Sequence, residues 1–436
     1  MTTVRRTNKA RAAGGAGPDE IDPAVFRRRL MAWYRLHARV LPWRETTDPY
    51  RIWVSEIMLQ QTRVAAVVVH YKEFLRRFPT LIALSLASEA DVLAAWSGLG
   101  YYRRARMLHK AAQFLMTERG GVLPITCDEL RTLPGIGEYT GAAIASIAFG
   151  EGVAVVDGNV ERVLLRLTGR REDNGAGMRS LVRRQAQRLM PVQRTVEAEP
   201  VESQAGRSAW TTQERLAIAT AAHPAEPAGA ARSPVGDEAD HDPQGGSAAQ
   251  AVRSNPAGDH NQAMMELGAT ICLPRAPLCL HCPVHSLCRT RGEHATVPRP
   301  AQLSRPAAYL LETRKNGDWA EVLLERRAPD ASLMPGMFEL PPLPLDAVQG
   351  REPVLRVRHA ITGTNYYVQV FAASGKHVGK ARQADAAVLR EAVPASERDL
   401  TWVRSSRLPA LPLTGLARKI LQRLKVMDAP EIELLK

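Results

Sequence analysis

The chain of 436 residues is longer than one hydrophobic core usually supports, which predicts two domains. Its formal net charge of +13 favours nucleic acid as a partner, and a merely basic protein is the alternative. No segment approaches the ~18 consecutive apolar residues that a membrane-spanning helix needs, which excludes an integral membrane protein of that kind.

Residues 1–20 are basic, rich in small side chains, and without the apolar core of a secretory signal. We expect a disordered basic tail there, with a transit peptide as the alternative. From residue 21 to about residue 190, apolar side chains recur three and four positions apart, which predicts an all-α domain. We place its end at residue 296.

The stretch "VSEIMLQQT", residues 54–62, puts one acid, Glu56, into an apolar helical run. The simplest interpretation is an amphipathic core helix that carries one acid on its surface. The alternative is a buried functional carboxyl group, because burial disfavours the charged form and raises the pKa of such a group. The motifs further along the chain decide between the two.

A Gly-x-Gly turn, Gly135 and Gly137, opens the small-residue helix of "LPGIGEYTGAAIASIAFG", residues 133–150. The backbone N–H groups of such a turn and the positive end of the next helix can bind a phosphate group without side-chain specificity. The pattern favours a helix-hairpin-helix that binds DNA backbone, with an ordinary helix–helix connection as the alternative.

Asp157, in "VAVVDGNVERVLLRL", ends an apolar run and precedes a helix. A plain N-cap is the simplest interpretation. The same position keeps the carboxylate ionised and aimed, so it could stabilise a developing cation, and Asn159 is placed to orient it.

Residues 192–255 are rich in Ala, Pro, Gly, Ser and acids, which predicts a disordered insertion with one marginal helix at 211–222.

A loop with four cysteines follows, in which six, two and five residues separate successive cysteines. Four thiolates in one short loop suit a [4Fe–4S] cluster, and zinc is the alternative. The spacing lacks paired Cys-x2-Cys motifs and favours iron–sulfur. The four cysteines are Cys272, Cys279, Cys282 and Cys288.

A polar connector, 297–305, leads to a second domain at 306–436. Alternating patterns predict strands within it, and an amphipathic pattern predicts a terminal helix at 413–425. We therefore expect a mixed α+β domain. The predicted strands are 307–314, 320–327, 354–362 and 365–373.

Taken in order, these motifs resemble the endonuclease III superfamily of helix-hairpin-helix DNA glycosylases, and within it the adenine DNA glycosylases of the MutY type. The resemblance covers residues 41–288 apart from the insertion. It rests on "LPWR", "PYRIWVSEIMLQQT", "WSGLGYYRRARMLHKAA", "VVDGNVERVL" and "NQAMMELGATIC".

The resemblance implies an enzyme that flips out adenine mispaired with 8-oxoguanine or guanine and excises it. Glu56 would be the general acid, Asp157 the stabilising anion with Asn159 beside it, and Tyr139 would lie near the sugar. Bifunctional relatives carry a lysine at position 139 as a Schiff-base nucleophile, and tyrosine cannot form an imine. The resemblance therefore implies a monofunctional enzyme that leaves an abasic site.

Further roles follow from the same resemblance. Arg44, Trp43 and Glu266 would line the adenine pocket. Gln61 and Tyr101 would enter the duplex beside the extruded base, although a core position is the alternative for Tyr101. The full set of expected DNA-contacting residues is Gln60, Gln61, Thr62, Leu99, Tyr101, Gly135, Gly137, Arg275, Ile361 and Thr362.

The C-terminal domain resembles the Nudix-like lesion-recognition domain of the same family. Relatives often carry Phe-Ser-His on the loop that contacts oxidised guanine, where this chain has Ile361, Thr362 and Gly363. That departure leaves the strength of 8-oxoguanine selectivity open. The resemblance implies a bacterial, cytoplasmic and nucleoid-associated monomer that holds a [4Fe–4S] cluster and binds double-stranded DNA, with no membrane partner.

Two rival functions use some of the same features. A [4Fe–4S] electron carrier would not need a phosphate-binding hairpin or an acid in an apolar helix. A non-catalytic protein that binds DNA lesions would not need Glu56 and Asp157 together. Release of free adenine would separate an enzyme from both.

Overall fold

The computed structural model describes residues 21–171, 175–192, 255–294, 302–317, 319–361, 363–373, 383–393 and 399–428. The predicted tail at 1–20 and the marginal helix at 211–222 lie outside these ranges. The described residues form two compact units. The first takes those of 1–40, 145–197 and 253–297, and the second takes those of 41–144 and 298–436, so the predicted helical domain contributes to both.

The first unit is helical. It contains α1 (Pro23–His37), α9 (Gly158–Thr168), α10 (Ala176–Leu189) and α12 (Pro256–Thr270), and then the short turns η3 (Cys279–His281) and η4 (His285–Leu287). Asp22, Asp157 and Asn255 cap the first turns of α1, α9 and α12 through their side chains. These caps explain why the helices begin where they do.

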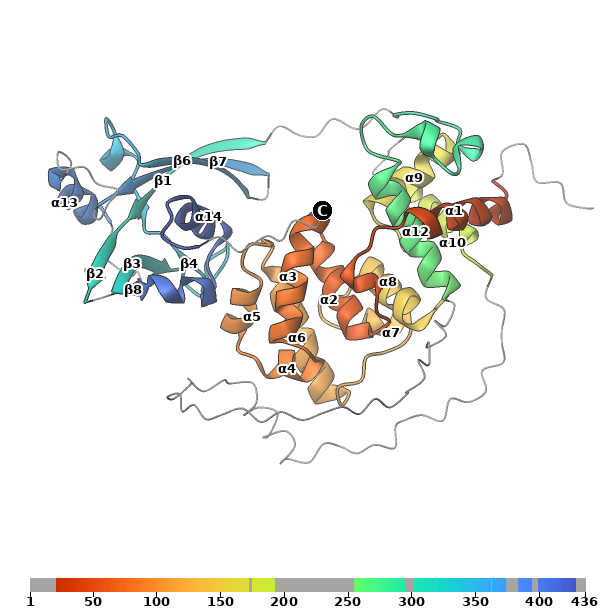
Figure 1. Cartoon of the computed structure of the whole chain (residues 1–436), viewed down its shortest axis with the longest axis horizontal. Helices are drawn as coiled ribbons and strands as arrows, with labels where there is room; N and C mark the ends of the chain where they lie inside the picture. Colours follow the sequence, from red (N-terminus) through yellow and green to blue (C-terminus); the bar gives the residue numbers. More distant parts are fainter. Residues whose placement is uncertain are drawn as a thin grey trace, which may run out of the picture. The chain divides into compact units, whose positions relative to one another are not determined.

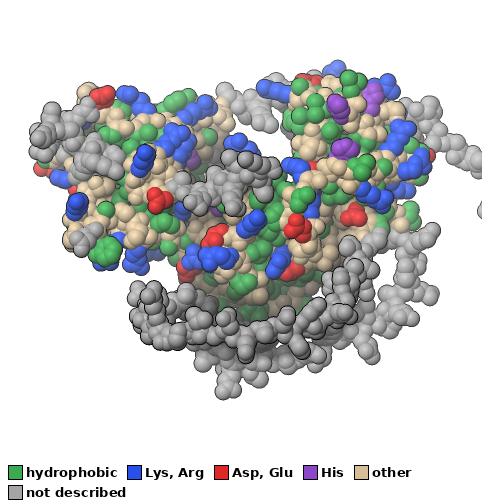
Figure 2. Space-filling view, viewed as in Figure 1, with side chains coloured by type: hydrophobic (Ala, Val, Ile, Leu, Met, Phe, Trp, Pro, Cys, Tyr) green, Lys and Arg blue, Asp and Glu red, His purple; other side chains and the backbone are tan. Residues whose placement is uncertain are grey.

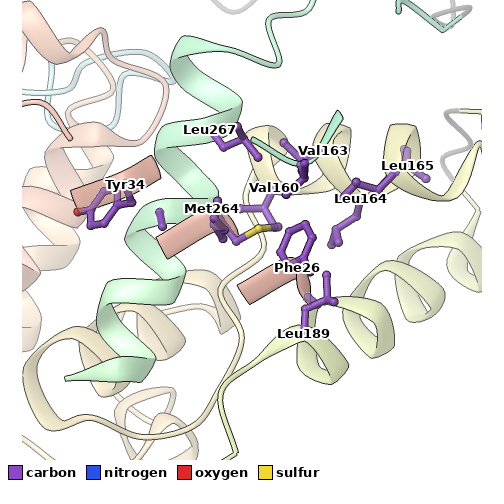
Figure 3. Close-up of a cluster of buried hydrophobic side chains, with 14 of the residues drawn as sticks. Phe26, Tyr34, Val160, Val163, Leu164, Leu165, Leu189, Met264 and Leu267 are labelled. Carbon is purple, nitrogen blue, oxygen red and sulfur yellow. The ribbon is translucent and has the colours of Figure 1, made fainter. Parts of the chain in front are cut away.

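The apolar faces of these four helices share one core. Phe26 on α1 and Met264 on α12 are buried in it, together with Val160 and Leu164 on α9 and Leu189 on α10 (Figure 3). Val284, in the cysteine loop, is also buried in this core. The core therefore fixes both the start of α9 and the loop that carries the cysteines.

The second unit begins with helices that follow one another closely. Trp53, Phe74 and Trp96 are fully buried among them, and the rings of Phe74 and Trp96 meet edge to face at 5.8 Å. The elements are η1 (Pro42–Arg44), α2 (Pro49–Leu59), α3 (Val64–Arg77), α4 (Leu81–Leu86), α5 (Glu89–Ala95), α6 (Arg103–Glu118), α7 (Cys127–Leu130) and α8 (Glu138–Phe149), of which the residues from Ala145 onward are assigned to the first unit. The prediction of a largely helical chain up to residue 190 is confirmed.

The C-terminal part of the second unit contains two sheets (Figure 1). One has the order β5-β1-β7-β6, in which β1 and β7 are parallel from Leu303↔Thr364 to Leu311↔Ala372. The other has the order β2-β3-β4, with β8 paired to β3. The strands are β1 (Leu303–Leu311), β2 (Thr313–Asn316), β3 (Trp319–Arg326), β4 (Phe338–Glu339), β5 (Pro342–Leu343), β6 (Leu355–Ile361), β7 (Thr364–Ala372) and β8 (Asp399–Arg404).

Helix α14 (Gly415–Arg423) shares a core with strands of both sheets, and Figure 1 shows it between them. Helix α13 (Gln383–Glu391) contributes Leu389 to a second core, with Leu310 of β1 and Phe371 of β7. Short turns complete the fold at η5 (Asp346–Val348) and η7 (Ser405–Ala410). The prediction of a sheet-containing C-terminal domain is confirmed, although β1 begins at Leu303, inside the predicted connector.

A short loop ahead of α6 is tied to this C-terminal part. The hydroxyl groups of Ser97 and Tyr102 both donate to the carbonyl of Leu413 at 3.0 Å, and Arg418 Nε donates to Ser97 Oγ at 2.8 Å. Ser97 and Tyr102 are both buried. These bonds fix the two ends of the segment that contains Tyr101.

Among the described residues, no helix is both long enough and apolar enough to cross a lipid bilayer.

Candidate functional site

Glu56 lies on α2 and is buried, with only 3% of its surface exposed. The interpretation of Glu56 as a surface acid is therefore wrong. Its Oε2 atom accepts a hydrogen bond of 2.6 Å from the hydroxyl group of Tyr139, in the first turn of α8. A buried carboxyl group with a fixed partner is held in one orientation, as proton transfer at a defined atom requires.

Gln60 joins the same two helices one turn further along α2. Its side-chain amide donates to Thr140 Oγ1 at 3.1 Å, and Thr140 is buried. Because Glu56 and Gln60 are four residues apart, their side chains share one face of the helix. The two bonds together fix the C-terminal half of α2 against the start of α8.

Gln61 and Tyr101 both have positive φ, 56° and 49°, which is uncommon for residues other than glycine. Gln61 is exposed, and Tyr101 exposes 50% of its surface whereas Tyr102 exposes 3%. The interpretation of Tyr101 as a core aromatic is therefore wrong, and Tyr102 occupies that core position. Leu99 is also buried, which disagrees with the expected contact of its side chain with DNA.

The hairpin between α7 and α8 depends on Gly135. Its φ is +77°, and a Cβ atom added there would lie 2.5 Å from Met107 Cβ on α6. Gly137 differs, because a Cβ atom added there would meet nothing within 4 Å. Both glycines are exposed, so the turn packs on α6 through Gly135 and leaves the backbone at Gly137 open.

Asp157 is the N-cap of α9, and both of its carboxylate oxygens accept a hydrogen bond. Oδ1 accepts from the backbone N–H of Val160 at 2.7 Å, and Oδ2 accepts from Asn159 Nδ2 at 2.8 Å. The sequence predicted that Asp157 caps the helix and that Asn159 orients its carboxylate, and both contacts are present in the structure. The carboxylate is fixed by its own helix.

Arg162 extends this arrangement toward the cysteine loop, and sequence reasoning did not single it out. Its Nη2 atom donates to Asn159 Oδ1 and to the carbonyl of Gly268, and its Nε atom donates to the carbonyl of Cys272, each at 2.8 Å. A Cβ atom at Gly268 would lie 2.5 Å from Asn159 Cβ, so glycine permits the close contact of α9 and α12. The spacing of Arg162 three residues after Asn159 was the available signal.

Glu266, on α12, is buried and paired with Arg39. The guanidinium donates through Nε and Nη2 to the two carboxylate oxygens, each at 2.7 Å, and the pairing raises the pKa of Arg39. Arg39 was also missed by sequence reasoning. Trp43 and Arg44 lie in η1 of the second unit. Trp43 is buried, and its ring meets that of Tyr71 edge to face with 5.5 Å between the ring centroids, whereas Arg44 is half-buried.

The four cysteines of the loop are half-buried, and the buried guanidinium of Arg166 donates to Cys272 Sγ at 3.4 Å. Burial, with smaller contributions from the other three loop thiols, raises the pKa of Cys282 to about 11. In the ranges that the structure covers, no three His, Cys, Asp or Glu side chains form a group that could hold a metal ion as they stand. The donor set of four neighbouring thiols is nevertheless the one that an iron–sulfur cluster requires.

The remaining predicted contact residues lie in the cysteine loop and at the turn between β6 and β7. Arg275 is exposed in the cysteine loop. Ile361 ends β6, and Gly363 turns the chain into β7 with a φ of +81°. Thr362 lies outside the described residues. Figure 2 shows Lys and Arg side chains on the visible face of each unit, in keeping with the net charge of +13.

Comparisons with known proteins converge on one family. Residues 54–191 match the HhH-GPD superfamily of base excision DNA repair proteins. The chain is 38% identical over 280 residues to the adenine DNA glycosylase of Rattus norvegicus, covering 62% of this chain and 42% of that protein. It is 47% identical over 148 residues to the adenine DNA glycosylase of Mycobacterium tuberculosis, covering 34% of this chain and 49% of that protein. The chain thus spans less than half the length of these relatives.

Proposed function

We propose that this chain excises adenine mispaired with 8-oxoguanine or guanine from double-stranded DNA, because residues 54–191 match the HhH-GPD superfamily of base excision DNA repair proteins and the chain is similar to adenine DNA glycosylases. The observation that carries the proposal is the buried Glu56 held by Tyr139 of the hairpin helix. A carboxyl group in that setting suits general acid catalysis. A lesion binder without chemistry has no use for it.

The chemistry assigns complementary tasks to two carboxyl groups. Adenine leaves deoxyribose readily only when N7 is protonated, and the sugar then develops positive charge. Glu56 donates that proton as the bond between C1′ and the base breaks, and Asp157 stabilises the oxocarbenium-like sugar, as paired carboxyl groups do in glycoside hydrolysis. Water then adds at C1′ and loses a proton, which gives the abasic sugar. The hydrogen bonds from Val160 and Asn159 keep Asp157 in one orientation without a further rearrangement.

Extrusion of the adenine requires groups that fill the vacated space, since unstacking costs a few kcal/mol. Gln61 and Tyr101 are exposed and take this role, with Gln60 and Thr62 beside Gln61. The backbone at Gly135 and Gly137 binds a phosphate group, as helix N-termini do. Arg44, Trp43 and Glu266 contribute to the adenine pocket.

The product is an abasic site with an unbroken strand. Strand cleavage through a Schiff base needs an amine near C1′ of the sugar, and position 139 carries a phenol. Tyr139 is further engaged in the bond to Glu56, which suits a role in orienting the acid.

Cys272, Cys279, Cys282 and Cys288 would hold a [4Fe–4S] cluster, which supplies Fe–thiolate bonds that close the loop. The loop presents Arg275, which is exposed and suited to a DNA phosphate. The C-terminal sheets form the Nudix-like lesion-recognition domain, with Ile361, Thr362 and Gly363 on the loop toward the oxidised guanine.

The test is single-turnover excision from duplexes with adenine opposite 8-oxoguanine, guanine, cytosine or thymine. We expect alkali-labile sites opposite 8-oxoguanine and guanine.

Glu56→Gln should lower the rate roughly a thousandfold, because general acid catalysis contributes about 10²–10⁴, while duplex binding persists. Glu118→Gln, the same change at an exposed acid on α6, is the matched control. Equal rates for both variants would refute the assignment.

A further inference from the structure

Arg104, the second residue of α6, caps the C-terminal end of α2. Its Nη1 atom donates to the carbonyls of Ile57 and Met58 at 2.9 Å each, and also to the carbonyl of Gln60. The last carbonyls of a helix have no partner within the helix, so these groups need an outside donor. One guanidinium nitrogen thus fixes the direction in which the chain leaves α2.

The other terminal nitrogen of the same guanidinium fixes a second segment. Nη2 donates to the carbonyls of Leu99 and Gly100, at 3.3 and 3.1 Å. It also donates to Thr62 Oγ1 at 3.1 Å, one residue beyond Gln61. Arg104 therefore bonds to both sides of Gln61 and to the two residues that precede Tyr101.

Aromatic rings complete the surroundings of the guanidinium. Its central carbon lies 5.4 Å from the ring centroid of Trp96 and 5.4 Å from that of Tyr101. Both distances are within the range of cation–π attraction. Trp96 Nε1 also donates to the carbonyl of Gly100 at 3.2 Å, so Trp96 supports the same turn.

The two segments share an unusual backbone feature. Gln61 and Tyr101 are both non-glycine residues with positive φ. Such conformations persist only where the surrounding structure holds them. Arg104 is in contact with both segments, on the carbonyl side of α2 and at the face of the Tyr101 ring.

We propose that Arg104 is a positioning residue that joins the Gln61 and Tyr101 segments into one rigid wedge for opening the duplex, an inference that rests on the proposed function. Arginine suits the task because its planar fork offers five donors in a fixed geometry, whereas lysine offers a single rotating ammonium group. Burial lowers the pKa of Arg104 to about 10, so the group stays charged at neutral pH.

A double-mutant cycle separates this role from a purely structural cap. Single-turnover excision of adenine opposite 8-oxoguanine is measured for Arg104→Lys, Tyr101→Ala and their combination, and again with Gln61→Ala in place of Tyr101→Ala. Lys110→Ala removes one exposed charge from the same helix and is the matched control. Melting temperatures of all variants are recorded beside the rates.

We expect Arg104→Lys to lower the rate about tenfold, and the double variant to excise within about twofold of Tyr101→Ala alone, because residues that act as a unit are non-additive. Lys110→Ala should leave the rate unchanged. The proposal would be overturned if the rate losses of the single variants multiply in both double variants, or if Arg104→Lys excises adenine at the wild-type rate. If the wild-type protein excises no adenine, the proposed function fails instead.

Should Arg104→Lys fail to fold, the coupling between the two segments remains measurable. Gln61→Ala and Tyr101→Ala alter exposed side chains, and their combination should cost little more than the larger single effect if one unit holds both. Independent, multiplying losses would show that the segments act separately and would contradict the joined wedge.

Discussion

Tyr139 is the residue that distinguishes base excision alone from excision with strand cleavage at the proposed site. Its hydroxyl group donates to Glu56 at 2.6 Å, so it acts on the acid, and it has no amine that could form an imine. The wild-type product should therefore break only after added alkali, and borohydride should trap little covalent complex. Efficient strand cleavage without alkali would mean that another amine acts as nucleophile.

Tyr139→Lys tests the same position from the opposite side. The new ammonium group would lie next to the buried Glu56 carboxyl group, which opposes its deprotonation, whereas desolvation favours deprotonation. We expect some borohydride-trappable adduct and strand cleavage, with adenine excision reduced because the hydrogen bond to Glu56 is lost. Unchanged excision by this variant would show that the Tyr139 bond does not orient the acid.

The two glycines of the hairpin differ in the space around them, and a matched pair of variants can measure the effect of that difference on stability. Gly135→Ala forces a Cβ atom to within 2.5 Å of Met107 and strains a positive φ, so we expect about 1–3 kcal/mol of destabilisation together with weaker DNA binding. Gly137→Ala meets nothing within 4 Å and should leave the melting temperature nearly unchanged. Equal melting temperatures for the two variants would contradict the packing of the turn on α6.

The cysteine loop leads to a prediction about the metal content of the protein. Purified protein should be yellow-brown and carry about four iron atoms per chain, as a [4Fe–4S] cluster held by four thiolates requires. Cys279→Ser should lose iron, whereas Cys127→Ser, at the buried cysteine of α7, should retain it. A colourless and active preparation with one zinc ion would establish the alternative metal.

Local patterns predicted most helices and several strands because the apolar spacing of each segment is set by the face that it buries. They also singled out Glu56 and Asp157, which stand at marked changes of pattern, as candidates for the proposed chemistry. They missed the strand β8, whose pairing partner β3 lies more than seventy residues earlier in the chain. They missed Arg39 and Arg162 for a related reason, because their partners Glu266 and Cys272 come from distant segments.

In the whole chain, the predicted insertion lies between two described segments of the first unit. Residues 193–254 lie outside the described ranges, whereas Asn255 caps α12 and donates to the carbonyls of Ser146 and Ile147. Replacing 193–254 by a short Gly-Ser linker should therefore leave excision and melting temperature nearly unchanged, since loop length changes closure entropy only slowly.

Asn255→Ala is the contrasting variant. Loss of an N-cap side chain costs about 0.5–2 kcal/mol, so this one substitution should destabilise the protein more than removal of the whole insertion does. A large loss of excision upon removal of 193–254 would show that the insertion contributes a binding surface.

The proposed reaction breaks the bond between adenine and deoxyribose, so the released base can be identified directly. A duplex with one adenine opposite 8-oxoguanine is incubated with the wild-type protein in excess, and the free bases are measured by mass spectrometry. We predict free adenine in an amount equal to the alkali-labile sites in the strand, and almost none from Glu56→Gln at the same protein concentration. Bound duplex with no free adenine, or equal release by Glu56→Gln, would contradict the account.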